Sequence, residues 1–292
     1  AALGAPAAAA AAPPPIVVAH GMGDSCFNRG MKSITELAGD TVGVYAVCVP
    51  TGDTWLKDTL NGFLLDMDSS VDVFAAAVRA DPQLSGGFSA FGLSQGNNLI
   101  RGYIAKYNDP PVRVFMSING INAGVGAIPD CSPQGAVIGG VCEAIAEVCG
   151  ALAYNSFVQG HLFQADYFRD PSKTDTDAYK THSQLAAWGN EGNVQNATLN
   201  ANFAKTDQFV LVKGTEDTMV WPNEGEWFGA MDPDDPWGTV LPMNQTAWYL
   251  EDKFGLRTAD EAGKVFFESF DGNHLQFTTA ELEGWLDKYF ST

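Results

Sequence analysis

A serine bracketed by two glycines lies between an apolar, strand-like run and a helix-like run of the chain. The segment reads Gly92-Leu93-Ser94-Gln95-Gly96. A strand that turns sharply into a helix needs glycines here, because a Cβ atom would collide in the strained backbone. The pattern therefore predicts a strand, a tight turn and a helix in succession, with Ser94 as a candidate nucleophile. An ordinary Gly/Ser loop would carry the same five residues, so the rest of the chain must decide between the two interpretations.

A second glycine-rich turn lies well upstream of the serine. The apolar run Ile16-Val17-Val18-Ala19 continues directly into His20-Gly21-Met22-Gly23-Asp24. Acyl-transfer chemistry needs fixed backbone N–H donors for the developing oxyanion, one from the residue after the nucleophile and one from a loop after an early strand. These donors are predicted at Gln95 and Met22. His20 is interpreted as a structural histidine, because the base of this arrangement comes late in the chain.

The serine predicts an acid and a base further along the chain, in the order Ser, Asp or Glu, His. His274 follows the apolar run 265–269 and a Gly-Asn turn, and Asp217 follows the apolar run 208–213 in a Gly/Thr turn. A carboxylate at a strand end can hold the imidazole in the correct tautomer. Asp217 is therefore predicted as the orienting acid and His274 as the general base. Glu216 is the alternative acid if Asp217 points away.

Alternating strand-like and helix-like runs predict a parallel sheet with both faces covered by helices. The expected strands are residues 16–19, 42–49, 87–93, 112–118, 208–213 and 265–269, and helical patterns cover 66–80 and 96–107. Residues 16–120 and 206–292 are accordingly assigned to an α/β core.

Residues 121–205 interrupt this alternation. They carry apolar and aromatic residues at helical spacing and no convincing strand pattern. We interpret the segment as a helical insertion that caps the core. Its two histidines, His161 and His182, lack the strand-turn context and are interpreted as surface or structural residues.

Composition excludes some functions. The chain has 292 residues, 46% of them hydrophobic, which is enough for one sizeable core. A net charge of −19, with few and scattered Lys and Arg, argues against binding to nucleic acid or to anionic lipid through basic patches. No apolar run is long enough to span a bilayer, so we expect a soluble protein. Residues 1–15, rich in Ala and Pro, are interpreted as a linker or as the remnant of a targeting peptide.

The chain resembles the palmitoyl-protein thioesterases, a lysosomal family with the α/β-hydrolase fold that removes long-chain fatty acyl groups from S-acylated cysteines. The resemblance covers essentially everything after residue 15 and is most specific in two segments, His20-Gly21-Met22-Gly23-Asp24-Ser25-Cys26 and Asn273-His274-Leu275-Gln276. Further matching segments are Gly92–Gly96, Gln164-Ala165-Asp166-Tyr167, Asp170-Pro171, Glu226-Trp227-Phe228-Gly229, Asp252-Lys253-Phe254-Gly255-Leu256 and Gly272 before Asn273.

The resemblance implies the same catalytic residues as the residue patterns do: Ser94, Asp217 and His274, with Met22 and Gln95 as oxyanion donors. It implies a palmitoylated protein or peptide as substrate, no cofactor and no metal, and a lysosomal, vacuolar or secreted location reached through the secretory pathway. The family often has a second cysteine after the first, where this chain has Phe27. An adjacent-cysteine bridge is therefore impossible here.

A fatty acyl chain has no polar handle, so its recognition requires an apolar groove, with about 0.8 kcal/mol for each buried methylene. The groove candidates are Ile145, Leu152, Phe157, Phe163 and Trp221. Two other functions remain open: a lipase, carboxylesterase or acyl-CoA thioesterase with the same catalytic groups, and a non-catalytic lipid-binding protein of the same fold.

Five cysteines leave at least one without an intramolecular partner. The resemblance implies a bridge between Cys131 and Cys142, and Cys26 could pair with Cys48 if the first two strands end side by side. None of the cysteine spacings is typical of a zinc site. Asn196-Ala197-Thr198 and Asn244-Gln245-Thr246 match the glycosylation sequon, so Asn196 and Asn244 are candidate glycosylation sites.

Overall fold

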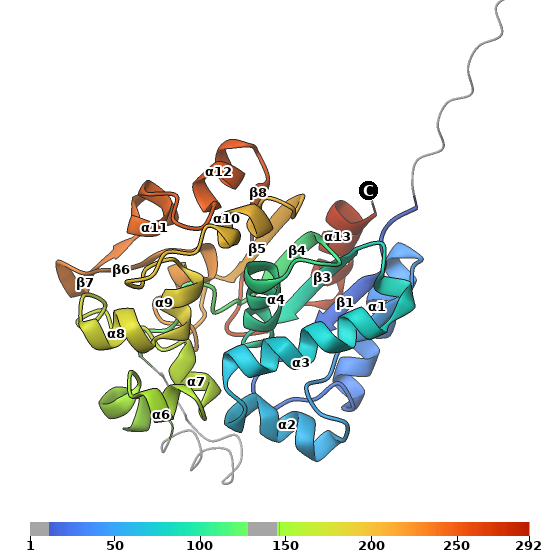
Figure 1. The fold of residues 1–292 in the computed structure, drawn as a ribbon. Coiled ribbons are helices and arrows are strands. Elements are labelled where there is room, and N and C mark those ends of the chain that lie inside the picture. The colour runs from blue at the N-terminus through green and yellow to red at the C-terminus, as the bar shows by residue number, and fades with distance from the viewer. Residues whose placement is uncertain (1–11, 128–144, 146, 292) are drawn as a thin grey trace, which may run out of the picture.

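The computed structural model describes residues 12–127, 145 and 147–291. Six parallel strands form one twisted sheet in the spatial order β2-β1-β3-β4-β5-β8 (Figure 1). The strands are β1 (Ile16–Ala19), β2 (Ala46–Cys48), β3 (Phe88–Leu93), β4 (Val112–Ile118), β5 (Gln208–Gly214) and β8 (Val265–Phe270). A separate antiparallel pair is formed by β6 (Ala230–Asp232) and β7 (Asp235–Leu241).

The strand predictions are confirmed to within one residue at five of the six strands of the large sheet. The exception is the second strand, which was expected over residues 42–49 and is only Ala46–Cys48. Helix α1 (Arg29–Val42) extends to Val42, and Gly43 ends it with a left-handed backbone, φ 76°. The first residues of the apolar run therefore belong to the helix and its terminal turn.

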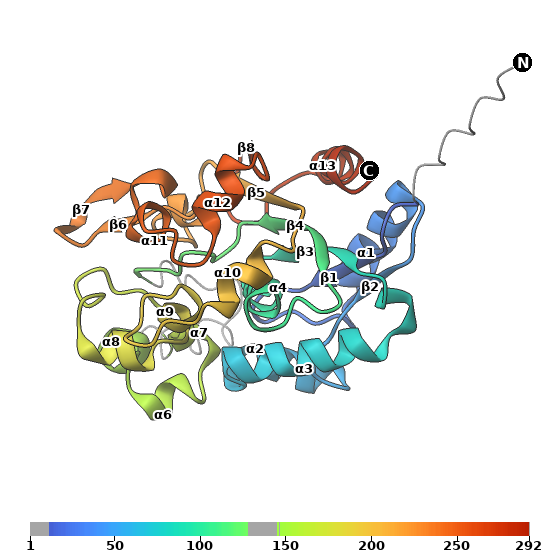
Figure 2. The same cartoon turned by 45° about the horizontal axis from the view of Figure 1, so that its top comes forward.

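Helices cover both faces of the sheet, as Figure 2 shows. Val17 and Ala19 of β1 face the core that contains α3 (Met67–Ala80) and α4 (Gly96–Lys106). Ile16 and Val18 face the opposite core, against α1 and α13 (Thr279–Phe290). This strict alternation is what a strand buried on both faces requires. Outside residues 121–205, the other helical elements that the structure describes are α2 (Trp55–Leu64), η1 (Pro82–Leu84), η2 (Asn223–Trp227), η3 (Met243–Gln245), α11 (Ala247–Leu250) and α12 (Leu256–Glu261).

The described part of residues 121–205 consists of short helices and turns rather than long cap helices. Residues 147–152 are helical. The labelled helices are α6 (Ser156–Gln159), α7 (Phe163–Asp166), α8 (Asp177–His182), α9 (Gln184–Trp188) and α10 (Thr198–Phe203). An isolated bridge between Val125 and Phe168 ties the segment to itself. These helices are short because side-chain caps and turns such as Ser183 and Gly160 interrupt the helical pattern every few residues.

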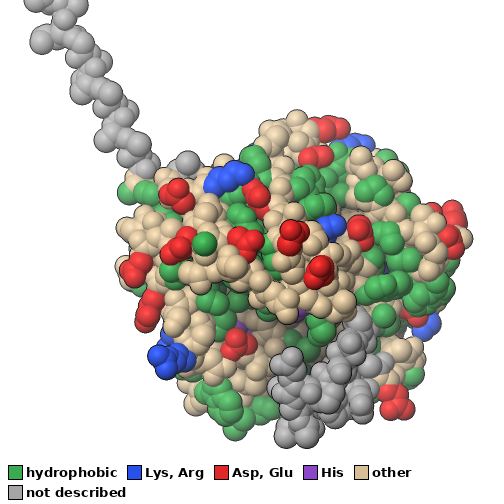
Figure 3. Space-filling view, turned by 180° about the vertical axis from the view of Figure 1, so that it is seen from behind, with side chains coloured by type: hydrophobic (Ala, Val, Ile, Leu, Met, Phe, Trp, Pro, Cys, Tyr) green, Lys and Arg blue, Asp and Glu red, His purple; other side chains and the backbone are tan. Residues whose placement is uncertain are grey.

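The charged side chains on the surface agree with the acidic composition of the chain. Figure 3 shows acidic side chains scattered over one face, with few Lys or Arg among them. Within the residues that the structure describes, none of the helices has the length and apolar character needed to cross a membrane.

Candidate active site

Ser94 lies at the turn between β3 and α4, where its backbone has a φ of 53°. This left-handed conformation is unfavourable for a residue with a Cβ atom, so the surroundings must hold it. Gly92 and Gly96 make the turn possible. A Cβ atom on Gly92 would lie 2.7 Å from the backbone nitrogen of Asn97, and one on Gly96 would lie 2.5 Å from the carbonyl oxygen of His20. The predicted strand-turn-helix unit is therefore present.

Ser94, His274 and Asp217 form one connected relay. Nε2 of His274 lies 2.8 Å from Oγ of Ser94, and Nδ1 of His274 lies 2.6 Å from Oδ2 of Asp217. The three residues come from the ends of β3, β8 and β5, whose carboxyl ends lie at the same edge of the parallel sheet. Glu216 is exposed and lies outside this relay.

The carboxylate of Asp217 has further hydrogen bonds. Oδ1 accepts from the backbone N–H groups of Met219, at 2.6 Å, and Val220, at 3.0 Å. Oδ2 also accepts from Nδ2 of Asn119 at 2.9 Å. Burial opposes the charged form, but the hydrogen bond from His274 and these N–H donors outweigh it and lower the pKa of Asp217 below its ordinary value. Asp217 is therefore ionised at the pH of any cell compartment.

The turns that carry Met22 and Gln95 lie beside the serine. Met22 lines the same small pocket as Ser94 and His274. In the described part of the chain, neither of the two backbone N–H groups donates to a protein acceptor. The amide side chain of Gln95 is held by Gly62 at 2.8 Å, Gln164 at 2.8 Å and Tyr167 at 3.2 Å.

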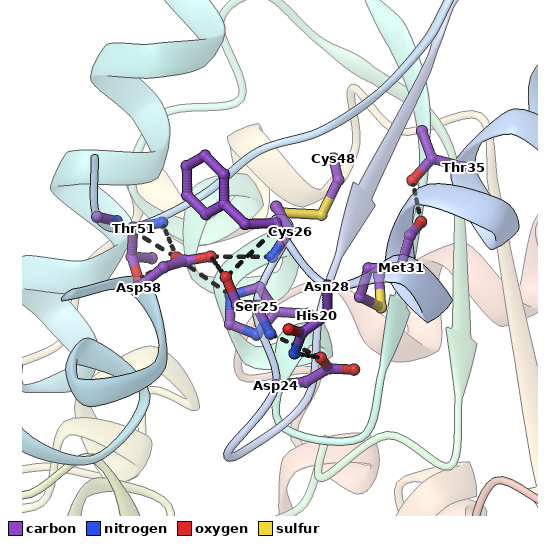
Figure 4. The surroundings of a disulfide bond; sticks show 12 residues. His20, Asp24, Ser25, Cys26, Asn28, Met31, Thr35, Cys48, Thr51 and Asp58 are labelled. Atoms are coloured by element: carbon purple, nitrogen blue, oxygen red, sulfur yellow. Dashed lines mark hydrogen bonds and ion pairs between the residues drawn. A yellow bond between two sulfur atoms is a disulfide. The ribbon is translucent and has the colours of Figure 1, made fainter. Parts of the chain in front are cut away.

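His20 has no hydrogen bond to the relay residues and forms a buried ion pair with Asp58 (Figure 4). Burial disfavours the charged imidazole, but the pairing with Asp58 outweighs this effect and raises the pKa of His20. Asp58 also accepts from Oγ of Ser25 at 2.8 Å and from the backbone N–H of Cys26 at 2.9 Å. Although burial opposes it, the pairing with His20 and these donors lower the pKa of Asp58 to about 2. The pair anchors the turn that contains Met22.

Cys26 and Cys48 form a disulfide bond beside this anchor, with their Cα atoms 5.5 Å apart. The pairing follows from the parallel contact of β1 with β2, which brings the ends of the first two strands side by side. Cys131 and Cys142 lie outside the described residues. Cys149 is buried and is not in a disulfide within the described chain, and burial raises the pKa of its thiol to about 12.

A pocket is lined by the serine and the histidine of the relay. Its lining residues are Met22, Ser94, Ile121, Val125, Ile145, Gln164, Tyr167, Met219, Val220 and His274. The cavity is narrow, about 40 Å³.

The structure brings one of the five groove candidates, Ile145, into this pocket. Leu152 and Phe157 are 52% and 69% exposed. Phe163 is buried and packs against the pocket residue Tyr167, with ring centroids 6.0 Å apart, but does not itself line the pocket. Trp221 stacks on Trp237 with ring centroids 5.8 Å apart. Helical spacing identified apolar residues of the segment but could not tell which of them face the serine.

Sequence reasoning missed several residues of the site. Asn119 follows β4 directly and donates to Asp217, and Glu226 is buried beside it. The sequence signal for Asn119 was a polar residue directly after a strand. The signal for Glu226 was its place in Glu226-Trp227-Phe228-Gly229, a segment that matches the family but had no role assigned to it. The apolar pocket residues Ile121, Val125, Met219 and Val220 follow strand ends or the acid turn, where no periodicity marks them.

The remaining candidates lie at the surface. His161 stacks on the ring of Phe157, with centroids 4.2 Å apart, and His182 is exposed, so neither belongs to the relay. Asn196 and Asn244 of the two sequons are also exposed.

A parallel sheet with a strand-turn-helix serine and a Ser-His-Asp relay at its carboxyl edge defines an α/β-hydrolase. The model of the palmitoyl protein thioesterase family matches residues 15–274, and the chain belongs to that family. It is 34% identical over 278 residues to palmitoyl-protein thioesterase 1 of Caenorhabditis elegans, a match that covers 94% of this chain and 91% of the relative. Palmitoyl-protein thioesterase 3 of Dictyostelium discoideum is 34% identical over 229 residues, 77% of this chain and 73% of the relative.

Other matches are weaker. The lysosomal thioesterase PPT2 of Homo sapiens is 33% identical over 101 residues, 34% of this chain and 32% of the relative. Among solved structures, RedJ with a bound PEG molecule covers 99% of this chain and 95% of its own, at 13% identity and a TM-score of 0.47. A likeness at that level adds nothing about function.

Proposed function

We propose that this protein is a serine thioesterase that hydrolyses long-chain fatty acyl thioesters on the cysteines of proteins or peptides. The observation that carries the proposal is the unbroken relay from Asp217 through His274 to Ser94, with contacts of 2.6 and 2.8 Å, in a chain of this family. Palmitoylated proteins are the substrate class indicated by the family name and by the names of the Caenorhabditis elegans and Dictyostelium discoideum relatives.

The first half of the reaction acylates the enzyme. His274 accepts the proton of Ser94 as Oγ attacks the thioester carbonyl carbon. The charge that develops on the carbonyl oxygen is stabilised by the backbone N–H groups of Met22 and Gln95. Their freedom from other acceptors in the described chain supports this role, because each hydrogen is available to the oxyanion.

Acylation ends when His274 gives its proton to the departing thiolate, the C–S bond breaks and an ester remains on Ser94. The second half releases the fatty acid. A water molecule gives a proton to His274 and attacks the ester carbon, and His274 then returns that proton to Oγ of Ser94 as the ester C–O bond breaks. Asp217 stays ionised throughout and stabilises the imidazolium in both halves.

The acyl chain enters the apolar pocket beside the serine. Ile121, Val125, Ile145 and Val220 support this assignment, because they are buried apolar side chains in the same cavity as Ser94. We place this pocket between the core, residues 16–120 and 206–292, and the insertion, residues 121–205.

We assign the protein to the lysosome, the vacuole or the extracellular space. The Cys26–Cys48 disulfide supports a route through an oxidising compartment, and the exposure of Asn196 and Asn244 supports glycosylation on that route. The human relative of this family is itself named a lysosomal thioesterase.

The test is a panel of matched thioesters and oxoesters of increasing chain length, assayed with the wild type and with Ser94→Ala. We expect hydrolysis of S-palmitoyl peptides by the wild type and a loss of several orders of magnitude in the variant, about 10⁶-fold if the relay acts as a unit. Near-normal thioesterase activity in Ser94→Ala would refute the catalytic assignment. Equal rates on oxoesters would indicate a lipase or carboxylesterase, and a preference for coenzyme A thioesters would indicate an acyl-CoA thioesterase.

An organophosphorus probe separates the enzyme from a non-catalytic lipid carrier. Labelling at Ser94 is expected, because only an activated serine reacts. Tight fatty-acid binding without labelling would support the carrier.

A further inference from the structure

A second acidic residue, Glu226, lies beside the catalytic acid and has no place in the relay. It belongs to the 3₁₀ helix η2, and its side chain is fully buried. Its Oε2 atom lies 2.9 Å from Nδ2 of Asn119, the same nitrogen that lies 2.9 Å from Oδ2 of Asp217. The two carboxyl groups therefore share one amide, which gives one hydrogen to each.

Asn119 also contacts the loop that carries the base, His274. Its Oδ1 atom accepts from the backbone N–H of Leu275 at 3.1 Å, directly after His274. Asn119 itself is fully buried, at the end of β4, with a φ of 45°. One side chain thus connects Glu226, the acid and the loop that carries the base.

The hydrogen bonds around the two carboxyl groups are unequal. Asp217 accepts from His274, Asn119, Met219 and Val220. Glu226 accepts from Asn119 and, at 3.3 Å, from the backbone N–H of Gly214, and its Oε1 atom has no partner in the described chain. A buried carboxylate needs several donors or a cation to remain charged. The negative charge therefore belongs on Asp217.

The basic side chains around Glu226 do not provide the positive charge that would stabilise a carboxylate there. On its own helix Glu224 pairs with Lys213 of β5 at 3.6 Å, and that lysine lies over the ring of Trp227. Arg101 of α4 donates to the carbonyl of Asn122 and lies 5.4 Å from the ring of Phe228. His274 pairs with Asp217. Among the described residues, none of these three basic side chains forms an ion pair with Glu226.

We propose that Glu226 is held as a neutral carboxylic acid and acts as a positioning residue, fixing Asn119 so that it aligns Asp217 and the loop of His274 without adding a second negative charge. The inference rests on the proposed roles of Ser94, Asp217 and His274. Burial, and then the negative charge of Asp217, raise the pKa of Glu226 to about 10, which agrees with this assignment.

The charge of Glu226 affects the pH at which an enzyme of an acidic compartment is active. The base must be unprotonated to accept the proton of Ser94. A second carboxylate near Asp217 would stabilise the imidazolium further and move the acid limb of the activity profile to higher pH. A protonated Glu226 supplies the packing and the hydrogen-bond acceptor without that effect.

The test compares Glu226→Gln, a neutral side chain of nearly the same shape, with Glu226→Leu, which removes the polar atoms. Glu224→Gln on the same helix is the matched control. We expect Glu226→Leu to lower kcat about 10–10²-fold with little change in KM, because the relay loses its alignment. Glu226→Gln should restore kcat to within about threefold, with the acid limb of kcat/KM unmoved. An acid limb that shifts to lower pH in Glu226→Gln would show that Glu226 is charged in the wild type and would overturn the proposal.

Infrared spectroscopy provides a readout that does not depend on activity. Burial raises the pKa of Asp166 to about 9, so this second buried carboxyl group also contributes protonated-acid absorption between pH 5 and 8. The difference spectrum between the wild type and Glu226→Gln should therefore contain the protonated-acid band of Glu226, and the difference spectrum between the wild type and Glu224→Gln should not. A wild type minus Glu226→Gln spectrum without a protonated-acid band would overturn the proposal even if the Leu variant does not fold. Activity that survives in Ser94→Ala would instead refute the proposed function, and the infrared result would still stand.

Discussion

Nε2 of His20 lies 3.2 Å from Oδ1 of Asp58, and this buried ion pair joins the turn after β1 to helix α2. The same carboxylate accepts from the backbone N–H of Thr51 at 2.7 Å, which fixes a third segment. The turn that contains the candidate oxyanion donor Met22, helix α2 and the segment of Thr51 are therefore joined by one charged group. Removing that charge leaves several buried donors without an acceptor.

Asp58→Asn should destabilise the fold by about 2 kcal/mol at pH 6, an order-of-magnitude figure from the lowered pKa. A carboxyl whose pKa is lowered by folding contributes stability above its unfolded pKa, near 4, and loses it as the pH falls through about 2. The difference from the wild type should therefore shrink below pH 4 and vanish near pH 2. Denaturant unfolding at several pH values measures this difference in the free energy of unfolding. Asp53→Asn, an exposed acid, is the control and should stay within about 0.5 kcal/mol.

Asp217→Asn should reduce kcat about 10⁴-fold, because the amide no longer holds the productive tautomer of His274 or stabilises its charged form. The adjacent exposed acid supplies the control, and Glu216→Gln should leave the steady-state rate almost unchanged. Comparable losses of kcat in both variants would mean that the two carboxylates act through the overall electrostatic potential of the site and not through the 2.6 Å contact between Asp217 and His274.

Gly96→Ala should cost more than about 3 kcal/mol, because the added Cβ would meet the carbonyl oxygens of Ala19 and His20, and backbone cannot move aside as a side chain can. Gly30→Ala is the matched substitution. Nothing lies within 4 Å of its added Cβ, and it lies in helix α1, so a gain of about 0.5–1 kcal/mol is expected. Thermal melting of the two variants decides the point, and equal effects would contradict the close approach at Gly96.

Replacing both Cys26 and Cys48 by serine should lower the free energy of unfolding by about 3 kcal/mol, since the bond restrains a loop with a sequence separation of 22 residues. Cys149→Ala changes a buried thiol that is in no disulfide of the described chain, and we expect a cost of about 1 kcal/mol. Denaturant titration of both variants gives the comparison. A double variant as stable as the wild type would exclude a stabilising bridge.

Val125→Phe should shift the preferred acyl chain to shorter lengths, because the larger side chain occupies the pocket that Val125 shares with Ser94. Each methylene excluded from the pocket corresponds to about fourfold in kcat/KM, from about 0.8 kcal/mol. Rates across thioesters from butanoyl to hexadecanoyl measure the shift. Leu152→Phe, at an exposed position, should leave the chain-length profile unchanged.

The pattern of residues predicted much of this protein because its strands are buried on both faces. Continuous apolar runs identified the six strands of the large sheet, and their order in the chain predicted the serine, the acid and the base at strand ends. Such signals are local: Gly92 and Gly96 flank Ser94 in sequence, so the turn can be recognised without knowing what surrounds it.

The residues that line the apolar pocket beside Ser94 could not be identified in this way. Phe163 and Ile145 fit the same helical spacing and are buried in the same core, yet Ile145 lines the pocket and Phe163 does not. Periodicity shows which face of a helix is apolar, but it does not show against which neighbour that face packs.

The sequence by itself determined the parallel α/β architecture, the identity of the three relay residues and the family, because each depends on residues in short, recognisable segments. Only the tertiary structure decided that Asn119 joins Glu226 to Asp217, that His20 pairs with Asp58, and which apolar side chains line the pocket beside Ser94. These contacts join residues far apart in the chain, and their energies depend on burial and distance, which no local pattern records.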